Sequence, residues 1–118
     1  HLPHGAPGGT LTVADGNVLI QEDTGNDAHL GRILAYSIPR KRLGVLATFD
    51  PALFTPGAPG FITQDEETSG IIDASRILGE GTFLLDAQVH KASADPELVE
   101  GGQYLALKVR SWRKVYGS

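Results

Sequence analysis

The sequence predicts an all-β fold, and three observations support that prediction. Seven short runs of apolar or alternating residues have the character of strands, and no helix longer than one turn is expected. Turn-forming residues separate these runs. The order of an apolar strand, a polar loop and an alternating strand also occurs twice along the chain. A length of 118 residues allows one modest domain with a small core.

Four strands are expected in the first half. The first is a short β-prone run before the turn signal Asp15-Gly16. The second opens with the continuous apolar run Val18-Leu19-Ile20, typical of a strand buried on both faces, and this run ends abruptly at Gln21-Glu22-Asp23. The third alternates between two faces and stops at Pro39, and the fourth follows a basic turn. Because the last three follow each other through a loop and a tight turn, we expect an antiparallel meander. The four are Thr10–Val13, Val18–Asp23, Arg32–Ile38 and Leu43–Phe49.

Three more strands are expected in the second half. The stretch Asp50–Gly60, rich in Pro and Gly, marks a boundary, and Pro51–Phe54 within it has the potential for one helical turn. A brief turn at Ser75–Leu78 and a polar loop at Lys91–Gly102 separate the strands that follow. These strands are Ile71–Ala74, Thr82–Val89 and Gln103–Val109.

The two halves resemble each other in organisation. We expect a flexible lead-in over residues 1–9 and one domain over 10–118, with blade-like halves at 10–50 and 61–118. Units of three or four strands that recur after about 40 to 50 residues are typical of propeller blades. The fold expected is therefore antiparallel meander sheets equivalent to about two blades of a β-propeller, a partial ring. Trp112–Tyr116 is the candidate for the missing last strand.

Composition narrows the classes of partner. The net charge of -4 argues against nucleic acid, and the clusters Arg40-Lys41-Arg42 and Arg110–Lys114 are interpreted as a solvated turn and a solvated tail. The chain has no apolar run of about 18 residues, so no membrane span is predicted. The lack of Cys excludes disulfides and thiolate sites. The lack of Met indicates a processed or excised piece of a longer polypeptide.

Carboxylates gather where predicted strands begin or end. Acidic groups crowd together only where a cation, a proton or open water separates them. Hard cations such as calcium take oxygen ligands, so these strand ends predict a metal site. His90 lies four residues after Asp86, on the same face of a strand, where it is a candidate metal ligand or catalytic acid–base residue. The candidate metal ligands are Glu22, Asp23, Asp65, Glu66, Glu67, Asp73 and Asp86.

Each candidate has a structural alternative. Asp73 is equally well interpreted as a cap that accepts backbone N–H bonds from the turn after it. Glu66 and Glu67 have the alternative of a solvated loop, and His90 that of a plain residue at a strand end.

The motifs taken together resemble one known family. The segments Asn17–Asp23 with the Gly-Asn-Asp loop after it, Asp65–Asp73 and Gly81–His90 are similar to the C-terminal part of PhoX-type bacterial proteins. Gly101-Gly102-Gln103 before the last strand also fits. The family is a group of exported β-propellers with alkaline phosphatase and esterase-like members, and the resemblance covers about Thr10 to Val109.

The resemblance implies export, a central cluster of calcium and iron, and hydrolysis of small phosphoesters. A complete propeller is several times longer, so we expect the isolated chain to be inactive. We expect either an excised fragment or an assembly in which other copies of the chain cover the open sheet edges. The alternative is a non-catalytic β module that binds calcium for structure, or that associates with a protein partner through its sheet edges.

Overall fold

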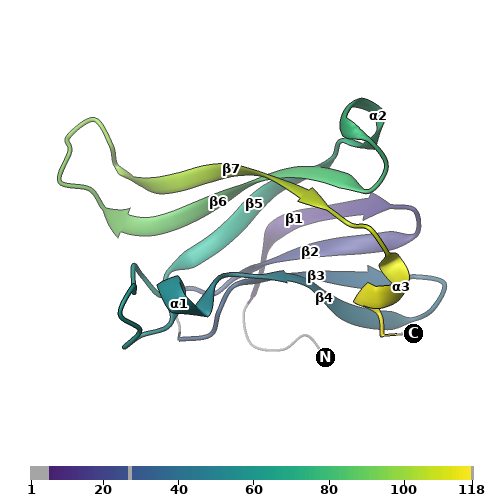
Figure 1. Cartoon of the computed structure of the whole chain (residues 1–118), viewed down its shortest axis with the longest axis horizontal. Helices are drawn as coiled ribbons and strands as arrows, with labels where there is room; N and C mark the ends of the chain where they lie inside the picture. The colour runs from purple at the N-terminus through teal and green to yellow at the C-terminus, as the bar shows by residue number, and fades with distance from the viewer. Residues whose placement is uncertain (1–5, 27, 118) are drawn as a thin grey trace.

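The protein, seen as a computed structural model, is described over residues 6–26 and 28–117, and its side chains from residue 14 onward (Figure 1). Within these residues seven strands form one antiparallel sheet in the order β4-β3-β2-β5-β6-β7, with β1 paired to β2 off this path. The all-β prediction is confirmed. The strands are β1 (Ala6–Ala14), β2 (Asn17–Asp23), β3 (Arg32–Ser37), β4 (Arg42–Thr48), β5 (Glu66–Asp73), β6 (Thr82–Ala92) and β7 (Glu100–Lys108).

The predicted meander is present in the first half. β2 pairs with β3 and β3 pairs with β4, both antiparallel. The β1–β2 turn has positive φ at Asp15 (52°) and Gly16 (76°), a conformation that favours glycine and a short polar residue. β1 begins at Ala6, so residues 6–9, expected in the lead-in, belong to a strand. Residues 1–5 of that lead-in lie outside the described residues.

The two halves share one sheet. Asp23 of β2 pairs with Glu67 of β5, and this bridge joins the strands of the first half to those of the second. Separate propeller blades would instead pack face to face, without ladder hydrogen bonds between them. β5 begins at Glu66, five residues before the expected strand, and so includes most of the acidic stretch. The sheet curls, so that its two edge strands, β7 above and β4 below in Figure 1, form the two borders of its open side.

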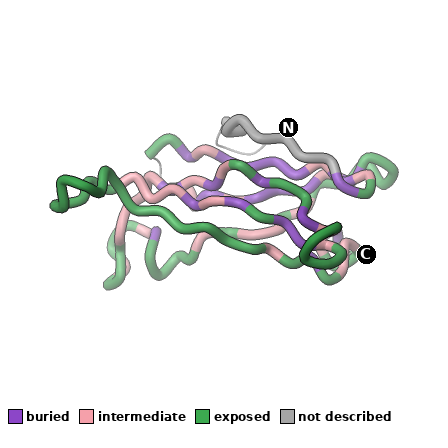
Figure 2. The backbone as a smooth tube through the Cα atoms, turned by 90° about the horizontal axis from the view of Figure 1, so that it is seen from above, coloured by how far each residue is buried: buried purple, intermediate pink, exposed green. Residues whose placement is uncertain are grey.

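A single core lies on the inside of this curl. It combines side chains from both halves, and the buried backbone runs along the middle of the sheet in Figure 2. Phe83 is 1% exposed and packs edge-to-face against Trp112, with ring centroids 6.2 Å apart. The buried core residues are Ala14, Leu19, Ile33, Ile71, Phe83, Leu85 and Val109.

Three short helices complete the described structure. α1 (Pro51–Phe54) and α2 (Ser75–Leu78) confirm the two expected turns. α3 (Trp112–Val115) stands where a last strand was expected, so that expectation is wrong. The Ser111 hydroxyl accepts the N–H of Lys114, which favours a helical turn. None of these helices is long and apolar enough to cross a membrane.

Candidate functional site: a polar cluster and an apolar cleft

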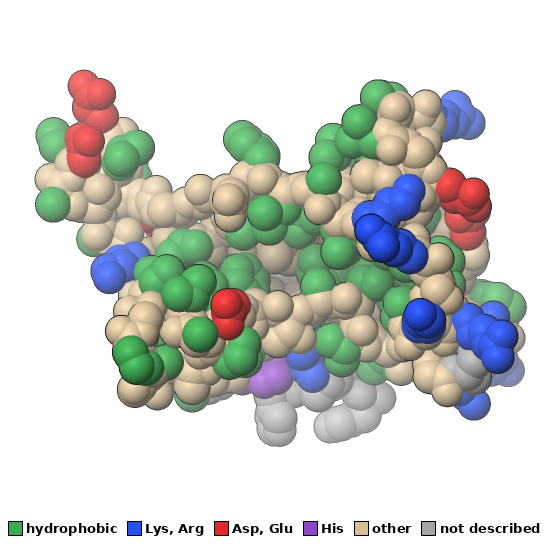
Figure 3. Space-filling model, viewed as in Figure 1, with side chains coloured by type: hydrophobic (Ala, Val, Ile, Leu, Met, Phe, Trp, Pro, Cys, Tyr) green, Lys and Arg blue, Asp and Glu red, His purple; other side chains and the backbone are tan. Residues whose placement is uncertain are grey.

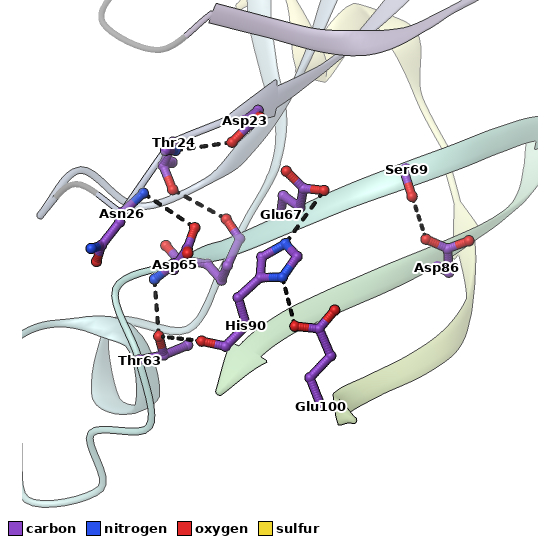
Figure 4. A network of polar contacts seen from close by, with 12 residues as sticks. Asp23, Thr24, Asn26, Thr63, Asp65, Glu67, Ser69, Asp86, His90 and Glu100 are labelled. Carbon is purple, nitrogen blue, oxygen red and sulfur yellow. Dashed lines mark hydrogen bonds and ion pairs between the residues drawn. The ribbon is translucent and has the colours of Figure 1, made fainter. Parts of the chain in front are cut away.

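Carboxylates from β2 and β5 meet at one end of the sheet (Figure 4). Asp23 and Glu67 are directly opposed across the bridge between these strands. Burial first, and then the negative charge of Asp23, raise the pKa of Glu67. Two neighbouring carboxylates of this kind bind a proton or a cation more readily than either does alone. The predicted strand ends therefore do approach each other at this point.

His90 lies between two glutamates. Its Nε2 is 3.6 Å from Oε1 of Glu67, and its Nδ1 is 2.8 Å from Oε2 of Glu100. The hydrogen bond to Glu100 is the main cause of the raised pKa of His90, against a smaller opposing effect of burial. When its ring is protonated, His90 neutralises part of this negative charge. Glu100 was not predicted from the sequence, because it falls in the stretch expected to be a polar loop. In the structure it begins β7 and reaches the site through the pairing of β6 with β7.

Asp65 is fixed at the edge of the same cluster. Its Oδ1 accepts the backbone N–H of Asn26 at 3.2 Å, and its own N–H donates to Oγ1 of Thr63 at 3.1 Å. Its carbonyl accepts the N–H of His90 at 3.0 Å, and its charge adds to the raised pKa of that histidine. Asp65 therefore contributes negative charge while most of its hydrogen bonds hold the loop in place.

Glu22 faces away from this cluster. Consecutive residues of a strand point to opposite faces, so Glu22 and Asp23 diverge. Glu22 is 2% exposed and its two oxygens accept hydrogen bonds from Arg32, at 2.9 and 2.7 Å. His29 lies 3.3 Å from the same carboxylate. This fork-shaped pairing raises the pKa of Arg32 and occupies the carboxylate with a protein cation.

Glu66 is buried, contrary to the solvated-loop alternative. It is 1% exposed, and its Oε1 accepts the backbone N–H of Gly31 at 2.9 Å. Its Oε2 has no hydrogen-bond partner among the described residues. Burial raises the pKa of this carboxyl group. Since Glu67 is the next residue along the strand, the two glutamates point to opposite faces.

The other two predicted ligands make local hydrogen bonds, Asp73 within a turn and Asp86 across a strand pair. Asp73 is exposed and accepts hydrogen bonds from the N–H and the hydroxyl of Ser75, which lower its pKa. This is the capping role that was weighed against metal binding. Asp86 accepts the Ser69 hydroxyl at 2.5 Å across the β5–β6 pair.

The structure thus brings together four predicted residues and separates the other four. Asp23, Asp65, Glu67 and His90 meet with Glu100. In the described ranges, no group of three or more His, Cys, Asp or Glu side chains is arranged to hold a metal ion. The separated residues are Glu22, Glu66, Asp73 and Asp86.

An apolar cleft was not predicted from the sequence. It has a volume of about 180 Å³ and lies on the inside of the curl, between the rims formed by β4 and β7 (Figure 3). Sequence patterns identify apolar residues, but they do not show that the edge strands β4 and β7 remain apart and leave a cleft between them. We call this feature the edge cleft, and its lining includes Ile33, Ala47, Phe49, Thr68, Leu85 and Leu105.

Thr68 is the notable polar member of the edge cleft. It is 8% exposed, and its hydroxyl has no hydrogen-bond partner within the described part of the chain. A buried hydroxyl without a partner costs free energy, about 1–3 kcal/mol in typical proteins. A ligand that accepted or donated one hydrogen bond here would recover that cost.

Comparison of the chain with protein-family models, with curated proteins and with solved structures gives no match.

Proposed function

We propose that the chain is a protein-binding module that takes an extended segment of another polypeptide into the edge cleft. The observation that carries this proposal is an apolar cleft flanked by two open strand edges. In the described residues no further strand pairs with the outer side of β4 or β7. Such edges offer unpaired backbone N–H and C=O groups, which a strand from a partner can satisfy.

The lining of the edge cleft suits the side chains of a strand. Alternate residues of an extended guest point the same way, so one set of apolar side chains would enter the cleft. Ala47 and Leu105, from the two rims, supply apolar contacts to that set. The unpartnered hydroxyl of Thr68 would hydrogen-bond a polar group of the guest. Backbone pairing then provides affinity, and the cleft provides a preference for alternating apolar residues.

Selection from a library of displayed peptides tests this proposal. Peptides that bind should carry apolar residues at alternate positions, and Ala47→Glu should abolish their binding because it places a charge in the cleft. Ile77→Glu is the matched control, since Ile77 lies on α2, is 87% exposed and does not line the cleft. Amide hydrogen exchange on β4 and β7 should slow when a selected peptide binds. Peptides that bind Ala47→Glu as well as the original chain would refute the proposal.

The opposed carboxylates support a second proposal, a cation held by Asp23 and Glu67. An ion between them would relieve the repulsion that helps to raise the pKa of Glu67. The described side chains do not form a complete metal site, so we derive no hydrolytic step from them. Membership of a PhoX-type exported propeller, with calcium and iron and a phosphoester substrate, is a proposal about a parent protein and rests on the sequence motifs.

Calcium titration followed by calorimetry tests the second proposal. Calcium should bind the original chain and raise its melting temperature, and Glu67→Gln should weaken that binding at least about tenfold, because one charged ligand is lost. Asp95→Asn, on an exposed loop, is the control. Equal calcium binding by both variants and the original chain would rule out this pair of ligands. Hydrolysis of an aryl phosphate is measured alongside, and we expect none from the isolated chain.

A further inference from the structure

Two basic segments that are far apart in the sequence meet at one end of the molecule. The β3–β4 turn carries Arg40 and Lys41, β4 begins at Arg42, and α3 carries Arg113 and Lys114. Arg42 donates a hydrogen bond from its Nη1 to the carbonyl of Tyr116, at 3.2 Å. We call these five residues, with Arg110, the basic end. The two clusters, each interpreted from the sequence as an isolated solvated segment, therefore form one surface (Figure 3).

The packing of α3 against β4 makes this surface a fixed one. Gly44 of β4 has no side chain, and a Cβ built there would lie 2.3 Å from the carbonyl oxygen of Val115. The Tyr116 hydroxyl donates to Oδ1 of Asn17 at 2.7 Å, which ties the end of α3 to the start of β2. Burial raises the pKa of Tyr116, and the positive charge of Arg40 opposes that rise with a smaller effect. These contacts hold α3 against β4, and with it Arg113 and Lys114 at the same end of the molecule as Arg42.

The cations of the basic end are free to meet an anion. All six are exposed, and none of them makes an ion pair within the described ranges. The nearby turn at Gly16, which packs on Pro39, brings the exposed Asp15 close to them. The chain has ten Lys and Arg residues and a net charge of -4, so six cations at one end are a marked asymmetry. Charge of this kind steers an acidic partner to one place on an otherwise acidic molecule.

The basic end lies further along β4 than the edge cleft. Ala47, Thr48 and Phe49 line the cleft, whereas β4 begins at Arg42. Trp112 and Val115 of α3 pack against the core there, and Val115 contacts Gly44 on the β4 rim. A strand that lay along the cleft and continued along β4 from Ala47 toward Gly44 would reach α3. Its next residues would then pass over Arg113 and Lys114.

We propose that the partner is an acidic polypeptide segment, in which the residues that enter the edge cleft are followed by carboxylates that bind the basic end. This inference rests on the proposed function and adds the charge of the partner. A polypeptide fits better than a nucleic acid, because the neighbouring surface offers open strand edges and an apolar cleft. The acidic remainder of the chain would repel a long polyanion.

Three synthetic peptides test the inference by fluorescence anisotropy at low and high salt. They share one short alternating Thr-Val segment, and each carries three Glu, three Gln or three Lys at the same end. The Glu peptide should bind about tenfold more tightly than the Gln peptide at low salt, the sum expected of a few exposed ion pairs, and high salt should remove the difference. The double variant Arg113→Glu with Lys114→Glu should reverse the preference in favour of the Lys peptide. Lys91→Glu, on the exposed distal part of β6, is the control and should leave the preference unchanged.

The outcomes separate this inference from the proposed function. If all three peptides bind equally and Ala47→Glu abolishes their binding, the inference of an acidic partner is overturned, while the proposed peptide-binding function is supported. Failure of all three to bind overturns both. A single-stranded oligonucleotide that binds more tightly than the Glu peptide, and that loses binding in the double variant, overturns the assignment to a polypeptide.

Discussion

Glu66 shows how one buried carboxyl group couples stability to pH. Its folded-state pKa is raised by burial, so the folded chain holds this proton more strongly than the unfolded chain does. The group therefore stabilises the fold fully below the pKa of an ordinary glutamate, and that stability is lost as the pH rises through the folded pKa. Glu67 and His90 have raised pKa values as well and act in the same direction.

The first prediction is that Glu66→Gln stabilises the protein at neutral pH. The amide keeps an oxygen for the N–H of Gly31 and removes the ionisable group, so the free energy of unfolding should rise by about 1 kcal/mol. Near pH 4, where the original carboxyl is protonated, the two proteins should differ little. Urea unfolding across this pH range measures the effect, with the exposed Glu97→Gln as control. A variant less stable than the original chain at neutral pH would contradict the account of Glu66.

A second prediction concerns the ion pair on the other face of β2. Arg32→Ala would leave the carboxylate of Glu22 buried, with His29 as its remaining partner. Loss of one member of a buried pair typically costs about 3 kcal/mol. The exposed Arg76→Ala, on α2, should change the free energy of unfolding by less than about 0.5 kcal/mol. Denaturant titrations of both variants compare the two costs, and equal small effects would show that the pair contributes little.

The sequence located four of the five residues of the polar cluster, and strand periodicity explains why Glu66 is not among them. Asp23, Asp65, Glu67 and His90 were all named from the crowding of acids at strand ends, and they do meet. Glu66 was expected beside Glu67 because both were placed in a loop ahead of a strand. Once β5 begins at Glu66, neighbours on the chain must face opposite ways, and one of the pair becomes buried.

At the scale of elements, apolar patterns located all seven strands. The start of β5 and the helical form of α3, however, depend on tertiary contacts that the local pattern does not show. The residues Glu66 to Gly70 are polar and lack a β signal, and β6 induces the strand by pairing with them. Trp112–Tyr116 has an alternating pattern that suits a strand. It forms α3 because its apolar side chains find the core inside the curl, where Trp112 packs on Phe83.

The third prediction tests the packing of α3 against β4. Gly44→Ala would bring a methyl group against the carbonyl of Val115, so α3 must move away from β4. We expect a loss of about 1–3 kcal/mol, typical of an overpacked contact, and a red shift in the fluorescence of Trp112, which is the single tryptophan of the chain. Gly101→Ala is the matched control, because its added Cβ would meet Val89 only at 3.5 Å, an ordinary contact. An unchanged emission spectrum in Gly44→Ala would show that α3 does not depend on this contact.

At the scale of the whole molecule, the pairing of β2 with β5 determines how the halves behave. Two similar halves were read from the sequence as two blades, since internal similarity is visible in a pattern and pairing between repeats is not. The bridge from Asp23 to Glu67 makes one sheet, and one core takes side chains from both halves. Similar repeats can therefore act as a single unit of stability.

The last prediction follows from that shared core. Leu19→Ala, in the first half, and Phe83→Ala, in the second, should each destabilise the protein by about 3 kcal/mol or more, since both side chains are almost fully buried. In each variant, Trp112 fluorescence and far-ultraviolet circular dichroism should lose signal at the same urea concentration, because the whole chain unfolds together. Exposed Leu98→Ala, on the loop between β6 and β7, is the control and should leave the midpoint almost unchanged. If Leu19→Ala separated the two signals, so that Trp112 kept its native emission after part of the sheet had unfolded, the halves would be independent units, as separate propeller blades would be.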